Sequence, residues 1–324
     1  MVLTSVREMK LKKIIQYLFA IIVIFTVVYF FYLEFKNNWN TIRAYHFAVN
    51  FYYIIFSIFV MMIGFLIDTY IWQVSVNNYL QIKLNFNQSM ALYNTTAMLK
   101  YIPGKIWTYT AQIALMSSKG ISKTILLYIN LICFVCFSFV SFIYALYYYL
   151  FYLKVLCCEI SVLIFVFLFT LDFVFIIWNT SIINYLLVFI NRIFKREIQP
   201  IKIKKFLLIY LQLLYLVAYM PMGIGMYFLA KGIGMEVPIS SIMALTATLS
   251  VSLMLSYIAF FSPGGLGIRE GTMFIMLKQF SNLEIALILP IAMRLVYIII
   301  ELLFGIIGIL VGMKYDYFPI QLKS

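Results

Sequence analysis

Charged side chains stand inside sequence that is otherwise apolar enough for a membrane interior. Lys100 and Lys105 flank a Pro-Gly pair. Arg269 and Glu270 follow the stretch "SPGGLG" at 262–267. An ion at the centre of a membrane helix costs roughly 2.5–3.5 kcal/mol on insertion scales, so such residues usually face a protein interior or a water-filled cavity. These positions are therefore the first candidates for chemistry.

Both charged clusters adjoin a break in the apolar pattern. Proline removes a backbone N–H and clashes with the preceding turn, and glycine adopts backbone shapes closed to other residues. In hydrocarbon the freed amides and carbonyls persist only where protein or a water-filled cavity satisfies them. A helix that starts after a break presents free N–H groups and a partial positive charge to the gap. An anionic headgroup, such as a phosphate, fits there.

Two further charges, Arg294 and Glu301, lie seven residues apart on nearly one face of an apolar helix. One interpretation is structural, with Arg269 or Arg294 paired to Glu270 or Glu301. The other is ligand contact, because the planar guanidinium of arginine suits phosphate oxygens. We expect the second role for Lys105 and Arg269. Asp68 and Asp172 lie in or near spans, and no role is assigned to them.

The composition defines the class of protein. Hydrophobic residues make up 65% of the 324-residue chain and charged residues 11%, and the mean hydropathy is +1.03. Ordinary soluble domains carry roughly 25% charged residues. We predict an all-α polytopic membrane protein forming a single domain over 1–324. The net charge of +13 collects at span boundaries, which argues against nucleic acid and for anionic lipid heads.

About seven to nine transmembrane helices are expected, since about 20 apolar residues cross the hydrocarbon core. The clear spans are 14–33, 51–71, 124–150, 160–178, 206–230, 239–261 and 285–312. Two stretches, 84–116 and 262–281, are predicted as re-entrant or broken segments. Their prolines are 160 residues apart (263 minus 103), about half the chain, which suggests an internal inverted repeat of the kind that forms a transporter's binding site.

Basic loops set the orientation. The N-terminal tail and the loop 191–205, with six Lys/Arg against one Glu, are predicted to be cytoplasmic, in a cell membrane. With these two anchors and the predicted spans, the segment 72–123 must start and end on the cytoplasmic side. It is then either a re-entrant hairpin or two short crossings. We take 239–261 as a full crossing. A re-entrant 262–281 would then place the C-terminus outside, and a crossing would place it inside.

No metal or cofactor is expected. Cys133 and Cys136 form a CxxC inside an apolar helix, where metal and redox chemistry lack polar partners, and His46 is the one histidine of the sequence. The sequence has no P-loop, so it does not encode ATP hydrolysis. The many aromatic residues are interpreted as packing and interfacial belt.

The two breaks resemble motifs of a known family. "MLKYIPGKIWTYTAQIALMSSKGIS" at 98–122 and "SPGGLGIREG" at 262–271 are similar to the paired Pro-Gly motifs of the lysylphosphatidylglycerol synthase transmembrane-region family, over nearly the whole chain. The resemblance implies a helical, flippase-like domain with a lipid-accessible cavity. In one branch of the family, the multiple peptide resistance factors, an aminoacyltransferase domain follows the membrane region. We expect no such domain in this sequence, and therefore no lysyl-transferase activity.

Residues and resemblance together give one set of candidate substrate-binding residues and no catalytic ones. The set comprises the two breaks, their charges and the two charges of the last span: Lys100, Pro103, Gly104, Lys105, Trp107, Pro263, Gly264, Gly265, Gly267, Arg269, Glu270, Arg294 and Glu301.

The leading hypothesis for function is a translocase for an anionic phospholipid or a polyprenyl-phosphate-linked glycan, with a cationic cavity between the two breaks. One alternative is a non-transporting membrane subunit of a cell-envelope polysaccharide or lipid-modification system, with partner proteins docked on loop 191–205. The other is an intramembrane lipid-modifying enzyme, in which Glu270 or Glu301 acts as a base. No catalytic constellation supports an enzyme.

Overall fold

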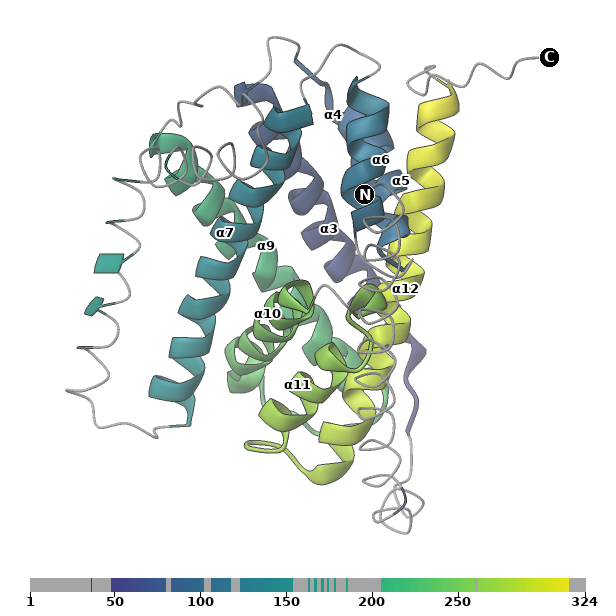
Figure 1. Ribbon diagram of the computed structural model, residues 1–324. Coiled ribbons are helices and arrows are strands. Elements are labelled where there is room, and N and C mark those ends of the chain that lie inside the picture. Colours follow the sequence, from purple (N-terminus) through teal and green to yellow (C-terminus); the bar gives the residue numbers. More distant parts are fainter. Residues whose placement is uncertain are drawn as a thin grey trace, which may run out of the picture.

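The computed structural model describes residues 48–79, 83–101, 106–117, 123–153, 205–259 and 262–314, with isolated residues elsewhere. Within these ranges every regular element is helical, which confirms the prediction of an all-α polytopic membrane protein (Figure 1). The predicted span 14–33 lies outside the described residues, as does most of 160–178.

Five described helices are long and apolar enough to cross a membrane, and each coincides with a predicted span. They are α3 (Phe51–Tyr79), α7 (Lys123–Tyr147) with its π-helical extension η3 (Tyr148–Tyr152), α9 (Lys205–Gly232), α10 (Ile242–Ile258) preceded by the short turn η4 (Ile239–Ser241), and α12 (Leu283–Lys314).

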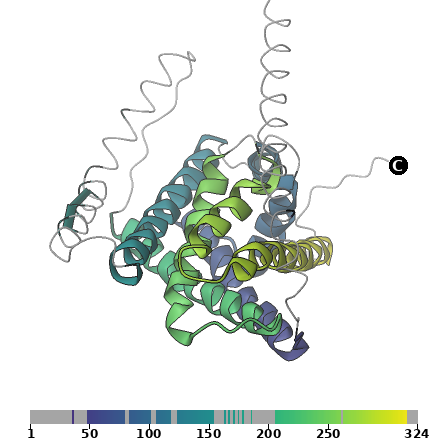
Figure 2. The ribbon, with the colours of Figure 1, turned by 90° about the horizontal axis from the view of Figure 1, so that it is seen from below.

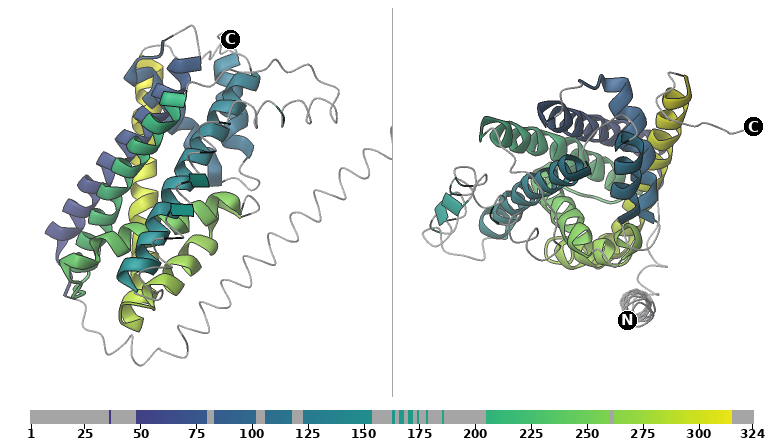
Figure 3. Two further views of the ribbon diagram at one scale, coloured as in Figure 1. Left: turned by 90° about the vertical axis from the view of Figure 1, so that its left-hand side faces the viewer. Right: turned by 45° about the horizontal axis from the view of Figure 1, so that its top comes forward.

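Helices α3 and α9 lie antiparallel along each other, as Figure 3 shows in its left view. Glycines make this close approach possible: a Cβ on Gly64 would lie 2.6 Å from the Met222 side chain, and one on Gly225 would lie 2.4 Å from Met61. The Ser57 hydroxyl donates to the Gly225 carbonyl across the interface at 2.7 Å. Small residues and a buried hydroxyl are what membrane helices use to associate, because apolar burial alone gives no preference over lipid.

The first broken segment descends beside α3 and returns. It is built from α4 (Phe86–Ser89), the π-helical η1 (Met90–Asn94), α5 (Thr95–Ala97) and the 3-10 turn η2 (Met98–Tyr101), and α6 (Ile106–Ser117) follows the break. Its descending limb of 16 residues (86 to 101) and α6 of 12 residues span about 24 and 18 Å, short of the roughly 30 Å hydrocarbon core. Of the two alternatives for 72–123, the structure has the hairpin.

The second broken segment enters from the opposite end of the bundle. Helix α10 stops at Ile258, η5 (Pro263–Gly265) follows, and α11 (Ile268–Leu277) runs back to the end where α12 begins (Figure 1). Figure 2, seen from below, has this segment nearest the viewer.

The predicted span 239–261 coincides with one of the five helices that are long and apolar enough to cross a membrane. Its length and composition suit a crossing, but α10 ends at a break beside the middle of α12, and α10 and α11 together form one hairpin. Helix α12 begins at the end of the bundle where α11 finishes, and it runs to the end where α7 and α9 begin (Figure 1).

The tips of the two hairpins meet. The turn η2 of the first hairpin contacts η5 of the second. Entry from opposite ends towards a common point is the arrangement that an inverted repeat gives a transporter.

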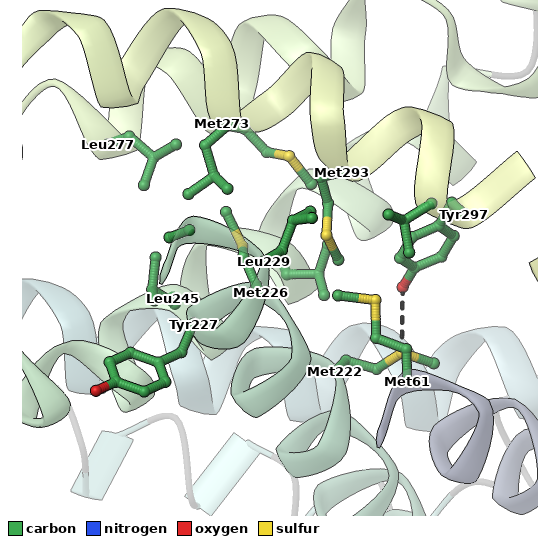
Figure 4. Close-up of a cluster of buried hydrophobic side chains, with 14 of the residues drawn as sticks. Met61, Met222, Met226, Tyr227, Leu229, Leu245, Met273, Leu277, Met293 and Tyr297 are labelled. Carbon is green, nitrogen blue, oxygen red and sulfur yellow. Dashed lines mark hydrogen bonds between the residues drawn. The ribbon is translucent and has the colours of Figure 1, made fainter. Parts of the chain in front are cut away.

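Methionines fill the space that anchors the second hairpin. Figure 4 shows Met61, Met222, Met226, Met273 and Met293 converging from α3, α9, α11 and α12. The hydroxyl of Tyr297 donates to the Met222 sulfur at 3.4 Å, the dashed line of Figure 4. Flexible thioether side chains fill irregular gaps, so a short helix such as α11 packs tightly without an ideal helix crossing.

The contact of α9 with α10 gives a stability prediction. A Cβ on Gly223 would lie 1.8 Å from the Thr246 hydroxyl and 2.8 Å from the Thr246 Cα. Rotation of the Thr246 side chain would move the hydroxyl but would leave the clash with the Cα. We expect Gly223→Ala to destabilise the fold by about 1–3 kcal/mol, the usual cost of overpacking, and to lower the melting temperature in detergent by several degrees.

Gly271→Ala is the matched control, because nothing lies within 4 Å of a Cβ at this position of α11. Alanine is the better helix former, so this variant should melt at the same temperature or slightly higher. Equal losses in both variants would contradict the close packing of α9 on α10.

Candidate functional site

A cavity of about 290 Å³ lies where the hairpin tips meet. Its walls come from α3, both hairpins, α7, α9 and α12. Sites that enclose drug-sized ligands have volumes of about 300–1,000 Å³, so this cavity holds one small headgroup and not a whole lipid.

Four charged side chains line the cavity: Asp68, Lys100, Arg269 and Glu301. The ammonium of Lys100 lies 2.5 Å from a carboxylate oxygen of Glu301, which ties the first hairpin to α12. Asp68 accepts a hydrogen bond of 2.6 Å from the Tyr93 hydroxyl. Three of the four charges thus have a polar protein partner close by.

Arg269 is held differently, against an aromatic ring. Its residue is 5% exposed, and its guanidinium carbon lies 3.7 Å from the centre of the Tyr297 ring, in a cation–π contact. Nη2 has no hydrogen-bond partner, and no carboxylate of the described ranges lies within ion-pair distance of this side chain. A buried guanidinium with an unused donor is costly in protein and is a ready partner for a ligand anion.

Three glycines shape the second break. Gly264, Gly265 and Gly267 have backbone φ angles of 56°, 72° and 83°, values that residues other than glycine rarely adopt. A Cβ on Gly265 would also lie 1.7 Å from the Ser256 hydroxyl at the end of α10. The backbone itself therefore requires the three glycines of "PGGLG".

Arg294 and Glu270 hold this break in place. Arg294 Nη1 donates to the Gly264 carbonyl at 2.8 Å and lies 3.4 Å from Glu270 Oε1. The other carboxylate oxygen of Glu270 accepts the N–H of Gly267 at 2.7 Å, where α11 begins. Both side chains are about a tenth exposed, and neither lines the cavity. The structural interpretation applies to this pair.

The seven-residue spacing on α12 has a geometric consequence. Arg294 and Glu301 lie about 10.5 Å apart along the helix axis and contact different hairpins. Tyr297 stands between them, beneath Arg269. Helix α12 thus supports both hairpins. Arg294 contacts the tip of the second hairpin, Glu301 contacts the first, and the Tyr297 ring between them packs against Arg269.

The thirteen predicted site residues separate into four groups. Lining the cavity are Lys100, Gly264, Arg269 and Glu301. Beside it, in or around the second break, are Pro263, Gly265, Gly267, Glu270 and Arg294. Away from it is Trp107, which is 49% exposed on α6. Outside the described residues are Pro103, Gly104 and Lys105.

Charges of opposite sign balance in the part of the cavity lining that the structure describes. This lining has two cations and two carboxylates. The positive character resides in one group, Arg269, because Lys100 is paired with Glu301.

Sequence reasoning missed the polar and aromatic wall. Lining residues that were not predicted include the aromatic Trp72, Tyr93, Tyr109, Tyr215, Tyr219 and Tyr257, the amides Asn94, Gln112 and Asn130, and Asp68. Polar residues inside apolar spans were the available signal, since they rarely occur there without facing an interior. The aromatic residues gave none, because tyrosine is equally common in packing and interfacial belts.

The two described cysteines, Cys133 and Cys136, are both free thiols. Cys133 lines the cavity, with its sulfur 3.3 Å from the Ser75 hydroxyl, and Cys136 is buried. In the part of the chain that the structure describes, no three potential metal ligands cluster.

These features define a class: a polytopic helical membrane protein in which two re-entrant hairpins enclose a headgroup-sized cavity. The sequence profile described as lysylphosphatidylglycerol synthase TM region matches residues 15–305. The chain belongs to that family, as its two Pro-Gly motifs predicted. No curated protein matches it significantly.

The Arg294–Glu270 pair gives a second prediction. Removing one partner of a buried ion pair leaves the other charge unpaired and costs about 3–5 kcal/mol. We therefore expect Arg294→Met to lower the thermal stability of the purified protein markedly. Combining it with Glu270→Gln, which keeps an acceptor for the Gly267 N–H, should recover much of the loss. Strictly additive losses in this double-mutant cycle would contradict the pairing.

Proposed function

We propose that this protein moves a lipid with an anionic polar head between the leaflets of a cell membrane. The observation that carries the proposal is Arg269, a buried guanidinium that lines a headgroup-sized cavity and has a donor with no partner among the described residues. Phosphate oxygens are the acceptors that a guanidinium binds best. Family membership supports a role in lipid modification or transport.

The cavity is suited to shelter the head while the tails stay in the bilayer. It has room for a headgroup alone, and it lies at the meeting point of hairpins that enter from opposite ends. A polar head crossing unaided would lose its hydration with no replacement, which costs several kcal/mol for each polar group. Protein donors and acceptors at the midpoint replace that hydration and lower the barrier.

The Lys100–Glu301 pair is the contact that a moving hairpin would break. It joins the first hairpin to α12, whereas Arg294 joins the second hairpin to the same helix. Rocking of one hairpin against α12 would open the cavity towards one leaflet at a time, as in transporters built from paired broken segments. We assign no catalysis to Glu270 or Glu301, since each is held by a cation.

The transport prediction uses reconstituted full-length protein. Proteoliposomes carrying fluorescent phosphatidylglycerol, or a fluorescent glycosylated polyprenyl phosphate, are treated with a membrane-impermeant quencher that reads the outer leaflet. We expect accelerated exchange of at least one of these lipids. Arg269→Gln should slow it by about tenfold or more, since a hydrogen bond to a charged group contributes about 1.5–3 kcal/mol.

Lys278→Gln is the control for charge, because Lys278 ends α11 on the exposed surface and does not line the cavity. It should transport as the unmodified chain does. No acceleration of either lipid, or equal rates for the Arg269→Gln and Lys278→Gln variants, would contradict the proposal.

The orientation prediction tests placement in the plasma membrane with the N-terminus inside. The basic loop 191–205 places Lys205 at the cytoplasmic side, and α9, the second hairpin and α12 then place Asn282 outside. In a background with the native cysteines replaced, a membrane-impermeant maleimide should label Asn282→Cys in intact cells. Lys205→Cys should react only after the membrane is opened. The reverse pattern would refute this orientation.

A further inference from the structure

The cavity has polar groups on more than one wall, beyond the one arginine. Trp72 is 2% exposed, and its indole Nε1–H, a donor only, has no acceptor in the described ranges. Thr108 has a buried hydroxyl without a partner as well. Both side chains line the cavity together with Asp68. A ligand that bound only Arg269 through an anionic group would leave these polar groups of the cavity without hydrogen-bond partners.

Acceptors accompany these donors. Asp68 receives one hydrogen bond, from Tyr93, and a carboxylate has room for several. The amide nitrogens of Asn94 and Asn130 are bonded to protein atoms: Asn94 to the Thr69 hydroxyl at 3.1 Å, and Asn130 to Gln112 Oε1 at 3.0 Å. Their carbonyl oxygens remain as acceptors, and both side chains line the cavity. Donors and acceptors are thus interleaved around one small space.

Three kinds of headgroup match this inventory to different degrees. A bare phosphate has no donors for the Asp68 carboxylate, and their like charges repel. An ammonium group has only donors, so it leaves Trp72 Nε1 unpaired. A hydroxyl both donates and accepts, so a ring that carries several hydroxyls pairs with the indole, the carboxylate and the amides together.

We propose that the lipid carries a glycosyl phosphate head, with its phosphate on Arg269 and its sugar ring against Trp72, Asp68 and Asn94. This inference rests on the proposed function and narrows it to a saccharide-bearing lipid. The wall of tyrosine and tryptophan rings supplies apolar faces with polar edges, the surface that a ring with an apolar face and a polar rim requires.

The test measures binding of soluble headgroups to the full-length protein in detergent by isothermal titration calorimetry. The probes are glucose 1-phosphate, mannose 1-phosphate, glycerol 3-phosphate, phosphorylethanolamine and glucose. At least one sugar phosphate should bind about tenfold or more tightly than glycerol 3-phosphate, which has fewer hydroxyls and no ring, because a site that pairs hydroxyls discriminates against ligands that leave its polar groups unpaired. Failure of both sugar phosphates to bind, or tighter binding of phosphorylethanolamine, overturns the proposal.

Variants locate the two ends of the head. Trp72→Phe keeps an aromatic ring but removes Nε1–H, so it should weaken sugar phosphate binding severalfold and leave glycerol 3-phosphate unchanged. Trp107→Phe, on the exposed face of α6, is its matched control and should change neither. Arg269→Gln should weaken both phosphates alike. Equal loss of both phosphates in Trp72→Phe places the sugar elsewhere and overturns the assignment.

The binding experiment and the transport experiment can fail independently of each other. Fast exchange of phosphatidylglycerol with no preference for sugar phosphates leaves the proposed function intact and refutes the glycosyl head. Selective sugar phosphate binding without lipid exchange has the opposite meaning, because the headgroup site then exists in a protein that does not translocate.

Discussion

Backbone groups that a helix break sets free inside a membrane must be satisfied by protein, and the second break meets this demand with side chains from two helices. Arg294 of α12 donates to the freed carbonyl of Gly264, and Glu270 accepts the freed N–H of Gly267. The two side chains lie 3.4 Å apart, so each partly neutralises the other. Without them the break would expose unpaired groups to hydrocarbon at several kcal/mol each.

The rest of the site follows from where this break is fixed. Because α10 stops short and α11 returns, Arg269 at the start of α11 lies over Tyr297 of the same α12. The first hairpin reaches α12 two turns further on, through Lys100 and Glu301. A space remains between the two tips, and the long helices α3, α7 and α9 close it with aromatic and amide side chains. The cavity is thus a consequence of two short hairpins sharing one long helix.

Charge pairing separates the functional arginine from the structural one. Arg269 and Arg294 are both deeply buried, but Arg294 donates through Nη1 to the Gly264 carbonyl and lies beside the Glu270 carboxylate. Arg269 has an aromatic ring beneath it and an unused donor. An ion held by a ring and no carboxylate keeps most of its attraction for a ligand anion, since cation–π contacts contribute only about 0.5–2 kcal/mol.

The sequence alone determined the class of protein, the family and the places where helices break. These follow from local properties: apolar composition, the Pro-Gly pairs, and ions whose membrane cost demands an interior. Only the tertiary structure decided that 239–261 ends at a break, that Glu270 faces Arg294 while Glu301 faces Lys100, and that Asp68 and Trp72 join the site. The seven-residue spacing puts Arg294 and Glu301 on one face of α12, but spacing says nothing of what packs there. Partners come from the approach of segments as far as 201 residues apart. Hydrophobicity, the strongest signal in a membrane sequence, is the same for a helix that crosses and for one that turns back.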